Sequence, residues 1–395
     1  MGLNASLARF AFSRPHLLLV EAAGGSAARL RVERLARERG WPVVETPADA
    51  DMIVVCGAVD AIEEYVSRVW DQLPGPRAQV RVSADDDVRV VLMKARACLT
   101  DPAMHLADVR RTERQPAAAP PMGDMDMGGH DMPASDPHAG HDMPASDPHA
   151  GHDMPATDPH AGHDMGGMSG REGHDMGGME MPAGLGMADR APDRDGLKLD
   201  VLTVPWGPVL RWWPEGLILT TVLQGDVVQS ATVQRLGSDH ERHAGWVAAL
   251  AHLDPPVASA VCRLDALVRL LGVAGWDGAR MRCQRLRDAL LAGEPAGRDL
   301  PRLVRQVSRS RSLARMTAGI ATTGGEDVPA RYRRWLTEAV AALTDGIVPP
   351  TADEPHVLHQ LPDLVTGMEL AGMRLVVASL DLALSGAEAR SAADA

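Results

Sequence analysis

The chain has 395 residues, an apolar content of 45% and a net charge of -13. This length allows two ordinary domains with sizeable cores. Most of the negative charge lies in residues 114–196, which contain fifteen Asp and Glu against four Arg, or -11. The flanking regions are therefore close to neutral, and nucleic acid is not expected among the partners.

The cysteine spacing and the hydropathy of the chain indicate which metal sites and which cellular compartment to expect. The chain has four cysteines far apart in the sequence and no CxxC pair. This spacing argues against a disulfide framework and against a locally built zinc or iron–sulfur site. No run of eighteen apolar residues occurs, and the apolar stretch His16–Val20 is too short for a secretion signal. The expectation is a cytoplasmic protein, at most peripheral on the inner face of a membrane.

Residues 1–113 predict an α/β domain with a mainly parallel sheet. Continuous apolar runs at Pro15–Ala22 and Ala50–Ala58, and the alternating run RAQVRVSA, are typical of strands. Two helical patterns lie between them: ARLRVERLARERG, which ends at Gly40, and AIEEYVSRVWDQL. Strands that alternate with helices imply a parallel sheet covered on both faces.

Residues 114–196 predict a disordered linker. The segment holds twelve of the twenty Met and eight of the fifteen His, with many Pro, Gly and Asp. Without apolar periodicity it cannot bury enough surface to offset chain entropy. HDM triplets begin at an interval of eleven residues, but Pro and Gly in the repeated units exclude a continuous helix.

The repeat also predicts metal binding. Imidazole and thioether are copper ligands, and the thioether selects Cu(I), while histidine alone also accepts nickel or zinc. The alternative is an acidic linker whose composition arose by repeat expansion. The predicted metal ligands are His130, Met132, His138, His141, Met143, His149, His152, Met154, His160, His163, Met165, His174 and Met176. No catalytic residue and no other cofactor site is predicted.

Residues 197–395 predict an α+β, mostly helical domain. LKLDVLTV, GLILTTVLQ and DVVQSATVQ are strand patterns, and Gln224-Gly225-Asp226 between the last two indicates a hairpin turn. From about His240 the apolar periodicity is helical, including one continuous pattern DLPRLVRQVSRSRSLARM. A β start followed by several helices is an α+β or helix-bundle arrangement.

Several other residues have both a structural and a functional interpretation. Gly24-Gly25-Ser26 indicates a tight turn, with Ser26 as the helix N-cap, or an anion site at a helix N-terminus. The tryptophans around Arg211 line either a partner surface or a hairpin packed on its own helices. These tryptophans are Trp206, Trp212 and Trp213.

Polar runs and cysteines are interpreted mainly as structural. Residues 239–243, DHERH, indicate a helix start capped by Ser238 or Asp239 rather than a metal site. The arginines between Arg302 and Arg315 indicate a solvent-exposed face or a subunit contact. Each cysteine is interpreted as a small buried hydrophobe; the four are Cys56, Cys98, Cys262 and Cys283.

Two parts of the chain resemble subunits of known redox complexes. ADMIVVCGAVDAIEEYVSRVWDQLPGPRAQVRV is similar to the small, cluster-bearing subunit of respiratory NADH–quinone oxidoreductase and of nickel–iron hydrogenases. WGPVLRWWPEGLILTTVLQGDVVQSATVQ and RLDALVRLLGVAGWDGARMRCQRLRDALLAGEPAGRD are similar to the opening hairpin and a helix pair of the large subunit. The resemblance covers about two-thirds of the chain. It implies a fused pair of small-subunit-like and large-subunit-like domains.

The cluster and metal ligands of those families are missing from the corresponding positions. The resemblance places cluster-binding cysteines after the first and third strands, where this chain has EAAGGSA (21–27) and RVSADDD (81–87). An iron–sulfur cluster needs about four convergent thiolates. The hairpin segment VLRWWPEG (209–216) lacks the expected histidines. The isolated chain is therefore expected to hold no iron–sulfur cluster and not to oxidise NADH.

The resemblance and the repeat together lead to two hypotheses. In the first, the chain is a non-catalytic structural or regulatory subunit of a membrane-associated NADH–quinone oxidoreductase-like or hydrogenase-like complex. Its partners are then other subunits of that respiratory-type complex, and the His/Met linker binds metal ions. In the alternative, the chain is a soluble copper-buffering or sequestration protein. The two hypotheses differ in whether the chain co-purifies with membrane subunits.

Overall fold

The computed structural model describes residues 10–101, 189–192, 198–322, 325–349 and 354–380. One compact unit combines the two ends of the chain, residues 1–116 and 188–395. A second unit, residues 117–187, lies wholly outside the described residues. The predicted disorder of the linker therefore stays a prediction.

The N-terminal part contains the predicted parallel sheet. Its strands follow the order β2-β1-β3-β4, and every neighbouring pair is parallel. The short β2 was not predicted from the sequence. The strands are β1 (Leu17–Glu21), β2 (Val43–Val44), β3 (Met52–Cys56) and β4 (Ala78–Val82).

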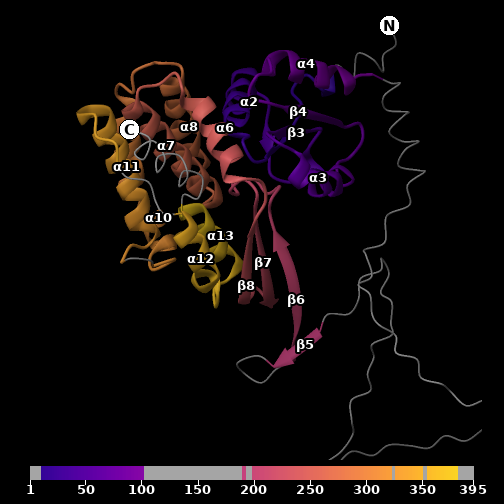
Figure 1. Ribbon diagram of the computed structural model, residues 1–395, viewed down its shortest axis with the longest axis vertical. Coiled ribbons are helices and arrows are strands. Elements are labelled where there is room, and N and C mark those ends of the chain that lie inside the picture. The colour runs from indigo at the N-terminus through magenta and orange to yellow at the C-terminus, as the bar shows by residue number, and fades with distance from the viewer. Residues whose placement is uncertain (1–9, 102–188, 193–197, 323–324, 350–353, 381–395) are drawn as a thin grey trace, which may run out of the picture. The chain divides into compact units, whose positions relative to one another are not determined.

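Helices cover both faces of this sheet, as predicted (Figure 1). Leu17 and Leu19 of β1 pack with α2 and α4, while Leu18 and Val20 belong to the core cluster that contains α3. Alternate residues of a strand point to opposite faces, so one apolar run supplies both cores. The helices are α2 (Ser26–Arg39), α3 (Glu63–Trp70) and α4 (Val88–Cys98), of which α4 was not predicted.

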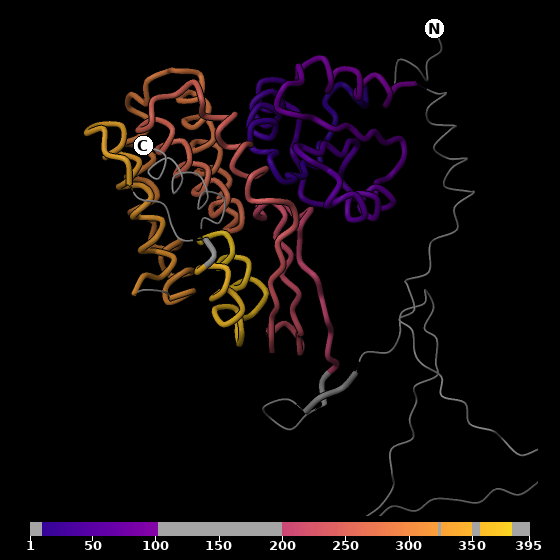
Figure 2. Tube along the Cα trace, viewed as in Figure 1, coloured from indigo at the N-terminus to yellow at the C-terminus, as the bar shows by residue number. Residues whose placement is uncertain are grey.

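The C-terminal part begins with an antiparallel sheet of order β5-β6-β7-β8. The predicted hairpin is formed by β7 and β8, which run side by side (Figure 2). Gly225 has φ +60° in its turn, a conformation that favours glycine. The strands are β5 (Asp189–Pro192), β6 (Lys198–Trp206), β7 (Leu217–Gln224) and β8 (Val227–Arg235); no strand was predicted at β5.

The rest of the described chain is helical, which confirms the mostly helical C-terminal part. The pattern predicted as one helix over residues 299–316 is divided because the Ser310 hydroxyl accepts a hydrogen bond from the Leu313 N–H, which starts a new helix. The helices are α6 (Asp239–Leu250), α7 (Pro255–Val273), α8 (Asp277–Leu291), α9 (Asp299–Ser308), α10 (Arg311–Thr317), α11 (Val328–Asp345), α12 (Glu354–Val365) and α13 (Leu370–Ser379).

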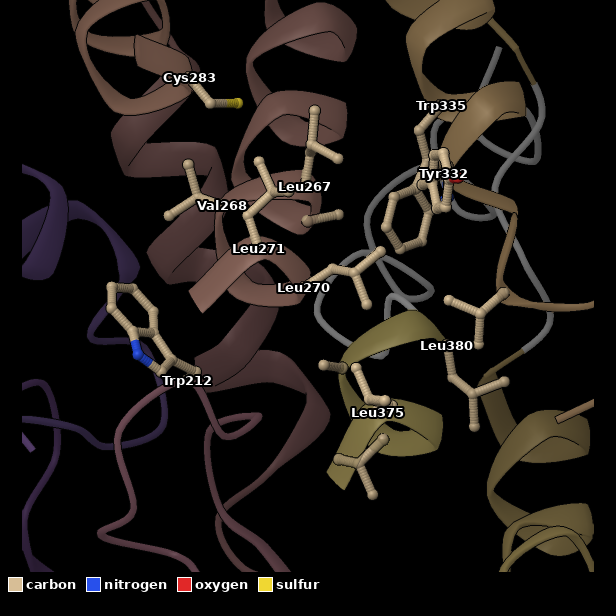
Figure 3. Packing of buried hydrophobic residues seen from close by; sticks show 14 of the residues in the cluster. Trp212, Leu267, Val268, Leu270, Leu271, Cys283, Tyr332, Trp335, Leu375 and Leu380 are labelled. Atoms are coloured by element: carbon tan, nitrogen blue, oxygen red, sulfur yellow. The ribbon is translucent and has the colours of Figure 1, made fainter. Parts of the chain in front are cut away.

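The largest core is built around α7. Its residues Leu267, Leu270 and Leu271 are almost completely buried and belong to one cluster with Trp335 and Tyr332 of α11 (Figure 3). A helix that is apolar on nearly all sides must be surrounded by other elements. No helix within the described ranges combines the length and apolarity that a membrane span requires.

Candidate functional site

A cluster of charged side chains is buried between α2, α7 and α8. The loop before β7 contributes one further member, Arg211. Each of these side chains is less than a tenth exposed. Isolated charges are expensive to bury, so their mutual pairing decides whether the arrangement is stable. The buried ion cluster consists of Glu21, Arg29, Glu33, Arg211, Asp265, Arg269 and Arg287.

Arg29 on α2 joins the two ends of the chain within this cluster. Its Nη1 and Nη2 atoms donate to the two oxygens of Asp265 on α7 at 3.1 and 2.8 Å. Its Nε atom lies 2.8 Å from Oε1 of Glu21, at the end of β1. The planar guanidinium matches a carboxylate in this two-bond geometry. One side chain thereby connects residues that lie 236 positions apart in the sequence.

Glu33, one turn further along α2, is held by two arginines. Arg211 Nη2 donates to its Oε1 at 2.9 Å, and Arg287 Nη2 donates to its Oε2 at 2.7 Å. Arg287 also donates from Nη1 to Asp265 Oδ1 at 2.5 Å. Each carboxylate therefore accepts hydrogen bonds from arginines of different elements, which makes the cluster one connected network.

Two carboxylates of the network, Glu33 and Asp265, stay ionised. Burial acts to raise the pKa of Glu33, but Arg287, Arg211 and Arg29 hold it well below its usual value. Asp265 behaves alike: burial opposes ionisation, while Arg29, Arg287 and Arg269 lower its pKa to about 2. Because arginine stays protonated, the ion pairs of Glu33 and Asp265 keep their charges around neutral pH.

Glu215 is the exception beside the cluster. It is 1% exposed, and neither of its carboxyl oxygens accepts a hydrogen bond from the described residues. Burial, reinforced by the negative charge of Glu21, raises its pKa to about 8, although Arg269, Arg235 and Arg242 act in the opposite direction. The raised pKa favours the protonated form of this buried carboxyl group.

The cluster lies at the carboxyl end of the parallel sheet, where open α/β folds bind their ligands. Here α6 occupies that place. A Cβ on Gly245 of α6 would lie 2.6 Å from the backbone carbon of Gly24, which follows β1. Gly24 itself has φ +74°, a conformation that favours glycine. Two glycines thus allow the helix backbone to contact the loop directly.

The Gly24-Gly25-Ser26 turn is present, but the predicted N-cap is wrong. Gly25 occupies the N-cap position without a side-chain hydrogen bond, and Ser26 is the first residue of α2. The Ser26 hydroxyl is buried, and no described residue pairs with it. The hydroxyl therefore lies within the first turn of the helix and does not cap it.

The loop before β7 packs within the chain, which decides between the two interpretations of its tryptophans. Trp212 is 8% exposed; its indole Nε1 donates to Glu45 at 2.8 Å, and the Arg211 guanidinium lies 3.8 Å from its ring centre. Trp213 is 5% exposed and donates to the backbone oxygen of Leu217. For both residues the structure shows intramolecular packing, one of the two interpretations that the sequence left open. Trp206, which is half-buried, donates to Thr221.

The run DHERH starts α6 as predicted. The Ser238 hydroxyl accepts a hydrogen bond from the Glu241 N–H, and the Glu241 carboxylate accepts one from the Ser238 N–H, which forms a capping box. In the described ranges, no group of three or more His, Cys, Asp or Glu side chains is placed to hold a metal ion. The thirteen predicted metal ligands of the repeat lie outside those ranges.

Three cysteines are buried, as predicted, while Cys98 is half-buried. Burial raises the pKa of the Cys56 thiol and of the Cys283 thiol. A raised pKa keeps the thiolate scarce and the residue unreactive. Cys56 ends β3 beside the cluster. Its burial and its raised pKa are typical of a cysteine that packs in the core and is not reactive.

Sequence reasoning missed the buried ion cluster. One signal was available: Arg263, Asp265 and Arg269 are charged residues within the mostly apolar α7. Charges on a helix that is apolar on nearly all sides need buried partners. The identity of those partners, Arg29 for Asp265 and Glu21 for Arg269, depends on how β1 and α2 pack against α7.

We compared the chain with models of protein families, with curated proteins and with solved structures, and none of them matches it.

Proposed function

We propose that the chain is a non-catalytic structural or regulatory subunit of a membrane-associated NADH–quinone oxidoreductase-like or hydrogenase-like complex. The observation that carries this proposal is the packing at the carboxyl end of the parallel sheet. The place where α/β proteins of this architecture bind ligands holds α6 and the buried ion cluster. A surface filled by the chain itself supports a scaffold role.

The ion cluster supports a fixed geometry between the two ends of the chain. Glu33 and Arg29 come from the N-terminal part, whereas Arg211, Asp265 and Arg287 come from the C-terminal part. Separating them would leave several charges unpaired in a low-dielectric environment, which is strongly unfavourable. A fused pair of domains locked in this way suits a subunit that holds its neighbours at a constant distance.

The resemblance supplies the class of partner. The stretches at 50–82, 206–234 and 263–299 are similar to the small and large subunits of these complexes. In this chain they occur in one polypeptide, with the small-subunit-like stretch first and the large-subunit-like stretches after it. The proposed partners are therefore the remaining subunits of a respiratory-type assembly, including those embedded in the membrane.

Native purification tests the proposal. A chromosomally tagged chain is isolated from detergent-solubilised cells, with an untagged strain as the control for non-specific binding. We expect membrane-embedded subunits to co-purify in fixed ratio with the chain. Recovery of a lone chain loaded with copper would contradict the proposal and favour copper buffering.

The His/Met repeat is predicted to bind several metal ions per chain, Cu(I) first. Each repeat unit offers two imidazoles and one thioether, close to a three-ligand set. Binding is expected to weaken as the pH falls through about 6.5, because imidazole must be deprotonated to act as a ligand. The measurement is a Cu(I) titration against a competing chelator.

The matched control keeps the length of the linker and removes its ligands. A variant with all thirteen predicted ligands replaced, His by Asn and Met by Leu, is expected to lose the Cu(I) capacity. Circular dichroism should remain unchanged, because neither folded part uses these residues. If both proteins bind Cu(I) equally, or neither binds it, the repeat is a linker without a metal function.

A further inference from the structure

A cavity of about 1000 Å³ opens between α7, α8, α9 and α11 in the helical part of the chain. Its interior is aliphatic: Val257, Leu290, Leu300, Val304 and Val340 line it. Leu290 and Leu300 are 3% and 4% exposed, so the cavity reaches down to the buried core. Its volume is at the upper end of the range for small-molecule sites.

The lining favours a flexible hydrocarbon chain over a planar ring. Apart from His252, every residue around the cavity is aliphatic, small, charged or a hydroxyl residue. Planar ligands are usually held by stacking on aromatic side chains, and no Trp, Tyr or Phe is available here. His252 is already engaged, because its Nε2 donates to the backbone oxygen of Leu291 at 2.9 Å.

Arginines line one end of the cavity. Arg305 and Arg309, with Ser308 between them, belong to the last turn of α9 and the residue that follows it. Neither arginine forms an ion pair with another residue in the described part of the chain. The acidic lining residue Glu294 precedes the first turn of α9. Nine residues of helix separate Leu300 from Arg309, about 13 Å at the usual rise. A second acidic residue, Asp254, occupies the N-cap position of α7 and also belongs to the lining.

The two arginines belong to a longer basic face. Residues 298, 302, 305 and 309 are all arginine and recur at intervals of four, three and four, which places them on one side of α9. The opposite side buries Leu300, Leu303 and Val307. Within the face, Arg302 lies 3.6 Å from Asp299, and both side chains are largely exposed. Such a surface attracts anions, and its strength depends on salt.

We propose that this cavity binds an anionic phospholipid, with one acyl chain along the aliphatic interior and the phosphate against Arg305 and Arg309. Guanidinium groups bind phosphate through paired, charge-assisted hydrogen bonds. Ser308 supplies a hydroxyl at the same end. Burial of the acyl chain against the aliphatic lining adds the hydrophobic contribution. Glu294 and Asp254 repel a phosphate, whereas Arg305 and Arg309 attract it, so the headgroup is placed at the two arginines.

The test uses the isolated full-length chain and short-chain phosphatidylglycerol below its micelle concentration, measured by isothermal titration calorimetry. We expect saturable binding that weakens with added salt. Phosphatidylcholine of equal chain length and glycerol phosphate, which lacks the chain, should each bind about tenfold more weakly or worse. Equal binding of glycerol phosphate would reduce the site to a simple anion site and overturn the proposal; equal binding of phosphatidylcholine would also overturn it.

Charge-removing variants test the part of the site that would bind the phosphate. Arg305→Gln with Arg309→Gln should lower the affinity about tenfold or more. The matched control, Arg39→Gln with Arg89→Gln, removes the same charge from exposed positions on α2 and α4 and should leave it unchanged. Equal losses in the two double variants would show general charge attraction and overturn the proposal.

A cavity-filling change tests the acyl site. Val304→Trp keeps all charges and should lower the affinity by a similar factor. Leu343→Met, which nearly preserves the volume of another lining residue, is its control and should bind as the unchanged chain does. Circular dichroism and thermal unfolding identify variants that fail to fold. Unchanged binding by a folded Val304→Trp protein would contradict a lipid chain in the cavity. Because the readout is lipid binding by the chain alone, it is independent of the proposed complex.

Discussion

Replacing Asp265 with alanine is expected to lower the free energy of unfolding by about 3–5 kcal/mol. Asp265 accepts hydrogen bonds from Arg29 and Arg287, and Arg269 lies 3.4 Å from its carboxylate. Its removal leaves these buried guanidinium groups without their shared counter-charge, while the cavity left by the side chain adds a smaller cost. Urea unfolding at pH 7, followed by tryptophan fluorescence and circular dichroism, measures the loss.

An exposed ion pair provides the control for this change. Arg68 and Glu64 on α3 are 59% and 71% exposed and lie 2.5 Å apart. Glu64→Ala should change the free energy of unfolding by about 0–1 kcal/mol, because water screens the pair and competes with it. If Asp265→Ala is as mild as Glu64→Ala, the buried network does not hold the two ends of the chain together.

Acid should remove the contribution of Asp265. Its pKa in the folded chain is about 2, below its usual value of 3.8. A lowered pKa means that the carboxylate stabilises the fold fully above about pH 4, and that this stabilisation is lost as the pH falls toward 2. The difference between the unchanged chain and Asp265→Ala should therefore shrink over that interval.

The helix α2 shows what the sequence predicts well. Its apolar positions and its end at Gly40 are local properties: Gly40 has φ +65°, and its N–H donates to the Arg37 carbonyl, as expected of glycine after a helix. The parallel sheet was predictable for a similar reason, because continuous apolar strands alternate with helices. The apolar pattern that predicts strands and helices extends over many residues, so one residue that departs from it does not change the predicted element.

The partners of α2 could not be predicted in the same way. Arg29 and Glu33 stand four residues apart, a spacing typical of an exposed helical ion pair. The structure buries both, because α7 and α8 supply Asp265 and Arg287 from positions more than 230 residues further along the chain. Only the tertiary arrangement distinguishes a buried network from a solvated pair. The same holds for Gly245, whose contact with Gly24 has no local signature.

Glu215→Gln is expected to stabilise the chain at pH 8 by about 4 kcal/mol and to have no such effect at pH 4. The reason is the raised pKa of Glu215, about 8 in the folded chain against a usual value of 4.5. Below pH 4.5 the carboxyl is protonated in both the folded and the unfolded chain, so it makes no difference. Between pH 4.5 and 8 only the unfolded chain ionises, and folding becomes progressively less favourable.

Glutamine has the shape of the protonated acid and does not titrate, so it removes this pH-dependent penalty. The measurement is the difference in unfolding free energy between the two proteins at a series of pH values from 4 to 8, which cancels the titration of all other groups. Glu64→Gln, at an exposed position on α3, is the control and should differ from the unchanged chain by about 1 kcal/mol or less.

The outcome also decides how the arginines near Glu215 act. Arg269, Arg235 and Arg242 favour the ionised carboxylate, whereas burial and Glu21 oppose it. A difference that grows from pH 4.5 to 8 means that burial and Glu21 prevail, and that a neutral acid lies beside the ion cluster at neutral pH. A difference that stays flat over this interval would mean that the arginines prevail and Glu215 is a further carboxylate of the network. In that case Glu215→Gln should destabilise the chain at pH 7, as Asp265→Ala does, because it would leave buried arginines unpaired.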